Sequence, residues 1–187
     1  MIYCDHNAST PLRPAVLDLI ARHFDGVILQ TLYGIADMES SLARLEAARA
    51  QSPLAEPLRK VMLLNASVSR DGQAARQHAK RFVSHIVSGW PDEVLKTKGI
   101  DPQAIQEVRK AYAENRGVDY AASLTPDEAV DRLIIAGTPA QCRERIAELF
   151  SLAARDGFTQ ITLGVPLGPD IPEVIKLWGE EILPMLR

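Results

Sequence analysis

The chain of 187 residues has little of what marks several large classes of protein. Its two cysteines, Cys4 and Cys142, offer no metal-ligand spacing, and we predict no metal site. No secretory signal precedes them, so we expect reduced thiols in a cytoplasmic protein. No apolar run approaches the ~18 to 20 residues of a membrane-spanning helix. These absences argue against a secreted, disulfide-bonded or membrane protein.

Basic clusters are missing as well. The net charge is −3, and lysine and arginine gather nowhere along the chain, so nucleic acid is not expected as a partner. What is present is 47% hydrophobic and 24% charged residues, which is typical of one globular domain with enough chain for a core.

The segment from Asp127 to Arg187 has the clearest local pattern. Thr138 is placed to cap a helix, and Pro139 to occupy its first position. Apolar residues then recur at three- and four-residue spacing. They are Cys142, Ile146, Leu149, Phe150 and Ala153. Phe158 to Leu163 reads as a strand, a loop runs from Gly164 to Asp170, and a final helix starts near Glu173.

Two further strands are predicted upstream, Val27 to Gln30 and Val61 to Val68, because both are short apolar runs. Helices are predicted around them. Their positions are the segment with the apolar stripe Val16, Leu17, Ile20 and Phe24, the segments Asp37 to Ala50 and Asp71 to Val87, and an insertion at about residues 90–125. Helices that alternate with about three parallel strands predict an α/β fold with a helical majority.

Two resemblances to known families are visible in the sequence. AGTP at 136–139, DGFTQITLGVPLGPD at 156–170 and WGEEILPML at 178–186 resemble the C-terminal part of luciferase-like flavin or deazaflavin oxidoreductases, in particular the reductases acting on methylenetetrahydromethanopterin. This resemblance implies a partial (β/α)8 barrel over residues 25–187 that binds FMN or the deazaflavin coenzyme F-420. Residues 1–24, an arm and a helix, instead resemble the N-terminus of cysteine desulfurases.

The luciferase-like resemblance also implies cofactor-binding residues. In that family a strand with the sequence DGV lets the backbone approach the coenzyme, and the resemblance implies this role for Gly26 and Val27. The alternative is that Gly26 only relieves crowding at the start of a strand. Asn65 stands near the end of a predicted strand, where it would meet the ring edge or satisfy loop backbone. We assign no catalytic residue, because the strands that carry those residues in the family have no counterpart before Asp25.

Two patterns resemble binding sites. His78, Arg81 and His85 share one helix side, but the histidines lie about 10 Å apart and no carboxylate joins them, which favours a solvated stripe over a metal site. Gly137 and Thr138 begin a helix whose free N–H groups attract anions. Because Pro139 removes one donor, a simple helix cap is favoured over a phosphate site.

Three functions follow as hypotheses. The first is a partial luciferase-like oxidoreductase or monooxygenase domain that passes hydride to or from a small organic substrate. The second is a non-catalytic α/β fragment that oligomerises or binds a partner chain through open sheet edges. The third is a fragment related to cysteine desulfurases, although the lysine loop that holds pyridoxal phosphate is absent. Ile2 to Cys4 are predicted to pair with a sheet edge.

Overall fold

The computed structural model describes residues 3–5, 14–33, 35–51 and 56–186, which form two compact units. The first unit contains the described residues up to Leu64 together with Ser151–Thr162, and the second contains Asn65–Phe150 and the residues from Leu163 onward. Three elements run from one unit into the other: β3 (Arg59–Val68), α8 (Pro139–Arg155) and β5 (Gln160–Leu167). No boundary between the units falls at Asp25, where the two resemblances meet.

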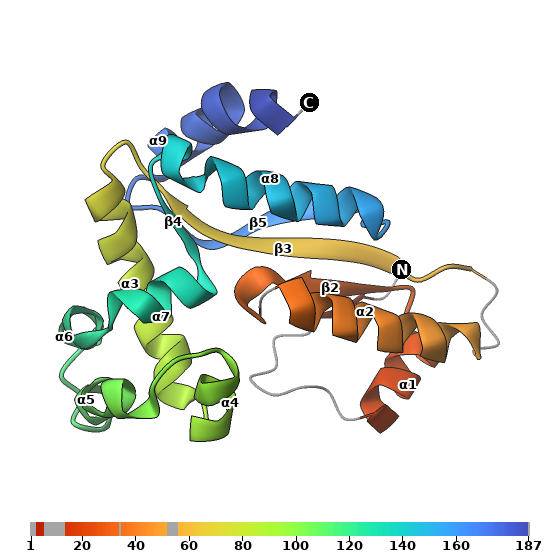
Figure 1. Ribbon diagram of the computed structural model, residues 1–187, viewed down its shortest axis with the longest axis horizontal. Coiled ribbons are helices and arrows are strands. Elements are labelled where there is room, and N and C mark those ends of the chain that lie inside the picture. The colour runs from red at the N-terminus through yellow and green to blue at the C-terminus, as the bar shows by residue number, and fades with distance from the viewer. Residues whose placement is uncertain (1–2, 6–13, 34, 52–55, 187) are drawn as a thin grey trace. The chain divides into compact units, whose positions relative to one another are not determined.

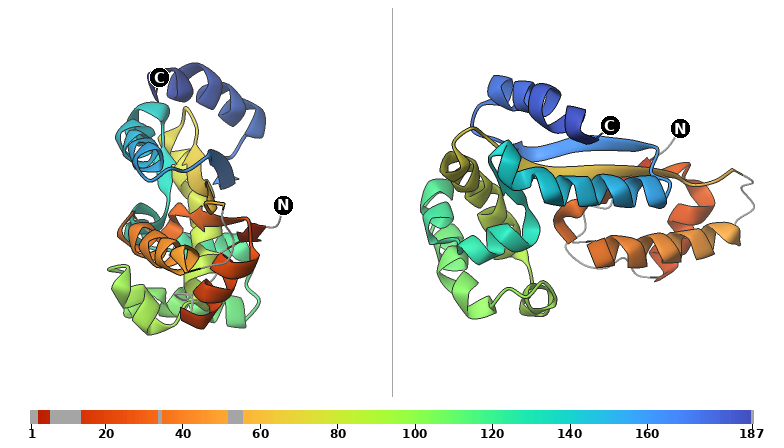
Figure 2. Two further views of the ribbon diagram at one scale, coloured as in Figure 1. Left: turned by 90° about the vertical axis from the view of Figure 1, so that its right-hand side faces the viewer. Right: turned by 45° about the horizontal axis from the view of Figure 1, so that its top comes forward.

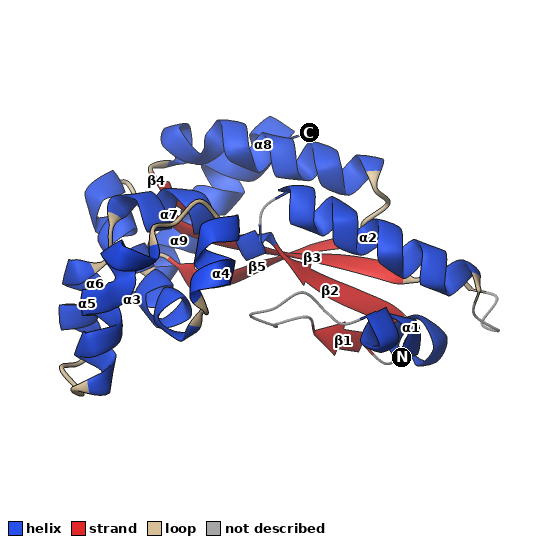
Figure 3. Ribbon diagram, turned by 60° about the horizontal axis from the view of Figure 1, so that its bottom comes forward, coloured by secondary structure: helices blue, strands red, loops and turns tan. Residues whose placement is uncertain are grey.

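The first unit is built on parallel strands. β1 (Tyr3–Asp5) pairs with β2 (Gly26–Gln30), and β2 pairs with the first half of β3, with Cys4 opposite Val27 and Val27 opposite Lys60. Figure 3 shows these strands side by side. The expected pairing of the N-terminal arm is therefore present at Tyr3 and Cys4, whereas Ile2 lies outside the described residues.

Two helices cover this sheet, α1 (Pro14–His23) and α2 (Ile35–Ala50), and α2 lies beside β2 (Figure 1). Their apolar residues form a buried cluster with the strands. The cluster comprises Ile20, Val27, Leu29, Leu42, Leu45 and Leu58, with Phe24 and Phe158 packed against it. One expectation was wrong: Val16 was placed on the buried stripe of α1, but it is 38% exposed, and the neighbouring Leu19 is 55% exposed.

The second unit begins with the second half of β3, which pairs in parallel with β4 (Ile135–Gly137). The chain between them is helical. It forms α3 (Gly72–Gly89), α4 (Asp92–Thr97), α5 (Pro102–Ala113), α6 (Val118–Leu124) and α7 (Asp127–Leu133). α3 contacts α5, α6 and α7. These yellow-green to green-cyan helices lie together in the right-hand view of Figure 2. The helical insertion expected at about 90–125 is thus three helices, of which α5 and α6 contact α3 while α4 contacts α5.

β5 pairs with β3, and residue numbers rise together along the two strands, as in a parallel pair. In the first unit the Thr159 N–H donates to the Lys60 carbonyl at 2.8 Å, and in the second Asn65 reaches the Val165 carbonyl. α9 (Ile171–Leu177) follows after a short loop. Asp170 caps it by accepting from the Glu173 N–H at 2.9 Å.

All three predicted strands are present, as β2, β3 and β5, but the loop expected from Gly164 to Asp170 was wrong over its first four residues, because β5 continues to Leu167. β1 and β4 add three residues each, a length at which the alternation that marks a strand cannot show. Within the described part of the chain, no helix is long and apolar enough to cross a membrane.

Candidate functional site

In parallel α/β folds, ligands gather where the strands end, and in the second unit β3, β4 and β5 all end. The turn after β3 is tied to its neighbours through Ser69. Its N–H donates to the Gly137 carbonyl at 3.2 Å, and its hydroxyl donates to the Glu173 carboxylate at 2.9 Å and accepts from the Asp71 N–H. One serine therefore joins the ends of β3 and β4 to the start of α9.

β5 presents an apolar surface in this unit. Leu163 and Val165, two positions apart and so on the same face, are 39% and 56% exposed, whereas Gly164 and Pro166 between and after them are buried. Beside them lies Asn65, which is 1% exposed and donates from Nδ2 to the Val165 carbonyl at 2.8 Å. This amide fixes β5 against β3. The exposed side chains of Leu163 and Val165 on β5 form what we call the apolar wall.

Asn65, which was predicted to bind the cofactor, is therefore a buried side chain that is already hydrogen-bonded within the protein. The bond to Val165 favours the structural alternative, and direct contact with a ring stays a prediction. Sequence reasoning did not single out Leu163 and Val165. The signal was available in Ile161, Leu163 and Val165, an alternation that predicts one apolar face of a strand.

Gly26 and Val27 lie in the first unit, at the amino end of β2. Both pair on two sides, Gly26 with Tyr3 and Arg59, and Val27 with Cys4 and Lys60. The Val27 side chain is fully buried in the core. Barrel sites form at the carboxyl ends of strands, so this placement favours a role in the sheet, and coenzyme contact by these two residues stays a prediction.

The start of α8 is closed by its own side chains. The Thr138 hydroxyl accepts from the Gln141 N–H at 3.3 Å, and Gln141 Oε1 accepts from the Thr138 N–H at 2.8 Å, a reciprocal capping box. Gly137 has φ +154°, and a Cβ there would lie 2.7 Å from Gln141 Oε1. The favoured reading of this motif, a helix cap, is confirmed, and the N–H of Thr138 is already used.

The stripe on α3 has protein partners at each position. His78 Nε2 lies 3.2 Å from the Pro166 carbonyl, Arg81 Nε pairs with Asp119 at 2.8 Å, and the His85 ring meets Tyr112 edge to face. Among the described residues no group of three or more His, Cys, Asp or Glu is placed to hold a metal ion.

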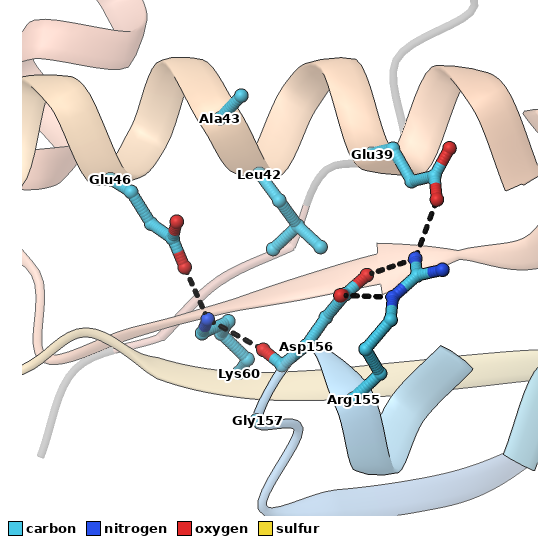
Figure 4. Close-up of a pocket in the computed structure, with 8 residues that line it drawn as sticks. All are labelled: Glu39, Leu42, Ala43, Glu46, Lys60, Arg155, Asp156 and Gly157. Carbon is cyan, nitrogen blue, oxygen red and sulfur yellow. Dashed lines mark hydrogen bonds and ion pairs between the residues drawn. The ribbon is translucent and has the colours of Figure 1, made fainter. Parts of the chain in front are cut away.

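The first unit contains a pocket of about 510 Å³ between α2 and the Arg155–Gly157 turn (Figure 4). Lys60 Nζ binds the Glu46 carboxylate at 2.5 Å and the Asp156 carbonyl at 2.6 Å. Arg155 lies between the carboxylates of Asp156, at 2.8 Å, and Glu39. The Arg155 hydrogen bond lowers the pKa of Asp156, and the same contact, with Glu39, raises the pKa of Arg155. A ligand here would have to displace these ion pairs, so they favour a structural role.

The strand ends of the second unit offer a surface for a flat organic ring. Among the described residues there, we find no group of donors that would hold a phosphate. The exposed apolar wall at Leu163 and Val165 is the kind of surface that packs on an aromatic ring face. Around the strand ends, however, stand the carboxylates of Asp71, Asp170 and Glu173, and the α8 start is capped.

Each described strand is followed by a helix, and an exposed apolar wall lies on β5. These features are typical of parallel α/β proteins of the barrel class, which bind ligands at their strand ends. The chain belongs to the luciferase-like monooxygenase family, whose model matches residues 10–156. That match begins inside the segment that resembles the desulfurase N-terminus.

Within this family the chain is similar to 5,10-methylenetetrahydromethanopterin reductases. It is 33% identical to that of Methanolobus tindarius over 172 residues, which are 91% of this chain and 51% of the relative. It is 34% identical to that of Archaeoglobus fulgidus over 179 residues, 93% of this chain and 52% of the relative. The chain thus spans about half the length of the curated relatives that it matches.

Solved structures show the same fold. The coenzyme F-420-dependent tetrahydromethanopterin reductase from Methanopyrus kandleri matches with a TM-score of 0.78 and 24% identity, over 99% of this chain and 50% of that one. An F-420-dependent secondary alcohol dehydrogenase matches with a TM-score of 0.59 and 15% identity, over 99% and 48%. Together with the family match, these likenesses confirm the expected partial barrel-like α/β fold.

Proposed function

We propose that the chain forms part of an oxidoreductase that uses FMN or the deazaflavin coenzyme F-420. The observation that carries this proposal is the identity of 33% and 34% with two reductases over more than nine-tenths of this chain. When bound, either coenzyme supplies a ring that gains or loses hydride, and the substrate is a small organic molecule. The relatives' own substrate, methylenetetrahydromethanopterin, is the first one to test.

The residues of this chain would position the ring rather than react. Leu163 and Val165 would lie against a ring face and exclude water from it. Asn65 would act one step away, because its hydrogen bond to Val165 holds β5 in register with β3. Gly26 and Val27 would contribute only through backbone groups, since the Val27 side chain is buried.

Fluorescence titration tests the proposal. Purified chain is added to FMN or coenzyme F-420 at fixed concentration, and saturable quenching with a micromolar dissociation constant supports it. If neither coenzyme shows saturable quenching, the proposal that this chain binds the coenzyme is refuted.

A variant pair locates the site. Val165→Asp places a charge on the apolar wall and should weaken coenzyme binding by about tenfold or more, since a carboxylate against a ring loses its hydration. Val118→Asp is the matched control. Val118 on α6 is also an exposed valine, and its change should leave binding within about twofold. Equal loss in both variants would contradict a site at β5.

A second candidate is a non-catalytic fragment that binds another chain. It is favoured by one observation: within the described residues the short strand β1 pairs with β2 alone, which leaves its other backbone edge for a partner strand. This candidate predicts association without quenching of either coenzyme, and the two functions are therefore separable.

A further inference from the structure

A second pocket, of about 260 Å³, lies among α3, α7, β4 and α8. α3 contacts both α7 and β4, and these three elements are seen together in Figure 1. All the residues that line the pocket fall within Asn65–Phe150 and so belong to the second unit. Leu163 and Val165 are not among them. The pocket is therefore separate from the apolar wall on β5, where we place the coenzyme ring.

The floor of this pocket is apolar. It contains Ile135 on β4, which is 4% exposed, and Cys142 on α8, which is 1% exposed. Cys142 is the first residue of the buried stripe of α8, and this stripe packs that side of the helix inward. A ligand that reached the floor would remove apolar surface from water, so the floor favours a ligand with an apolar part.

The rim of the pocket offers side-chain donors. Arg145 Nη1 donates to the Asp131 carbonyl at 3.1 Å and to the Ile134 carbonyl at 3.3 Å, which holds the guanidinium at the end of α7. Among the described residues, Nε and Nη2 of Arg145 have no partner. Gln141 gives its Oε1 to the Thr138 N–H, whereas its Nε2 has no partner within the described part of the chain. Donors on two side chains of α8 thus remain available at the rim.

The charge at the rim is positive. Arg76 and Arg145 face one carboxylate, Asp131, whose Oδ1 already accepts from Arg76 Nη1 at 2.6 Å. Arg76 also reaches Asp127 at 3.5 Å, but Lys80 pairs with the same carboxylate at 3.2 Å. The pocket of the first unit has the opposite balance, since three carboxylates line it with two cations that are both engaged in ion pairs. Only the rim in the second unit therefore favours an anion.

We propose that this pocket binds a small organic monocarboxylate. Nε and Nη2 lie on one edge of the Arg145 guanidinium, and such an edge matches the two oxygens of a carboxylate. The apolar part of the ligand would lie on Ile135 and Cys142. A cavity of about 150 Å³ holds benzene, so a volume of about 260 Å³ has room for one ring and its carboxylate. The site goes beyond the proposed function and stands whether or not a coenzyme binds.

Titration with benzoate, followed by ¹H–¹⁵N NMR of the whole chain at constant ionic strength, tests this. The amide signals of Ile135 and Cys142 should shift saturably, with a dissociation constant of about 0.1–10 mM for so small a ligand. Benzamide has the same shape without the charge and should bind at least about tenfold more weakly. Absence of saturable shifts with benzoate, or equal affinity for benzamide, would overturn the proposal. Inorganic phosphate that bound as tightly as benzoate would refute the carboxylate class.

Two substitutions at the rim should change the affinity for benzoate in opposite directions. Arg145→Gln should raise the dissociation constant by about tenfold or more. Asp131→Asn keeps an oxygen for Arg76 but removes the negative charge, so it should lower the constant by about threefold. A gain of this kind cannot come from misfolding, which matters because Arg145 also holds the end of α7.

Arg143→Gln is the matched control. Arg143 is exposed on the same helix, and two residues from Arg145 it projects to a different side. The substitution removes the same charge and should leave the affinity within about twofold. Far-UV circular dichroism checks that each variant is folded. Wild-type affinity in Arg145→Gln, equal loss in Arg143→Gln, or weaker binding in Asp131→Asn would each contradict a carboxylate site at Arg145.

Discussion

Gly168→Ala should destabilise the protein strongly, because the loop after β5 has no room for a methyl group. A Cβ at Gly168 would lie 2.4 Å from the Val68 carbonyl oxygen and 2.5 Å from Val174 Cγ2. The first neighbour is backbone at the end of β3 and cannot rotate away. Overpacking of this kind costs about 1–3 kcal/mol. The φ of +154° adds strain of about 1–3 kcal/mol.

The two effects together predict a loss of about 2–5 kcal/mol. For a chain of this length, each kcal/mol lowers the melting temperature by about 2–4 °C, so we expect a drop of roughly 5–20 °C in a thermal melt followed by circular dichroism. Gly179→Ala is the matched control. Its Cβ meets nothing within 4 Å, and in a helical turn alanine should be neutral or stabilise by up to ~1 kcal/mol. If Gly168→Ala melted with Gly179→Ala at the wild-type temperature, the tight approach of β3, β5 and α9 would be wrong.

Three other substitutions or conditions have defined outcomes. Thr138→Ala should cost about 1 kcal/mol in urea unfolding, while Thr138→Ser keeps the cap; equal stability of all three proteins would contradict the capping box. Burial raises the pKa of Cys142 to about 11, so in a Cys4→Ser background it should react slowly with a disulfide reagent at pH 8 and fully in urea; reaction within seconds would refute its burial. The hydrogen bond from Lys80 lowers the pKa of Asp127 below 3.8, so this stability is present above that value and is lost as the pH falls through the folded pKa. Because the side chain is exposed, the loss should be under about 1 kcal/mol, and it should vanish in Asp127→Asn melts at pH 3 and pH 7.

Local rules predicted the elements well because the signals were local. The α8 stripe is buried at Cys142, Ile146, Leu149 and Ala153, as its spacing predicted. Asp71 and Thr138 cap helices through contacts within three residues of themselves. Such contacts are specified by a short stretch of sequence, and no distant segment has to be known.

The candidate site was predicted less well, since its residues acquire meaning from distant partners. Asn65 was identified as polar at a strand end, but its partner Val165 lies a hundred residues away. Ser69 joins Gly137 and Glu173 through the parallel order of three strands, which no single window of sequence contains. The strand order, rather than the residue types, decides which of these groups meet.

The wrong expectation for Val16 has a specific cause. An apolar stripe shows which side of a helix is buried when something covers it, and the stripe through Val16 and Ile20 has that form. In the structure Ile20 packs on the first unit's core, while Val16 and Leu19 do not. On α9, Ile171 and Ile175 are likewise exposed, at 45% and 68%. Periodicity therefore predicts which side of a helix is apolar, whereas the burial of that side depends on a covering element that the helix's own sequence does not specify.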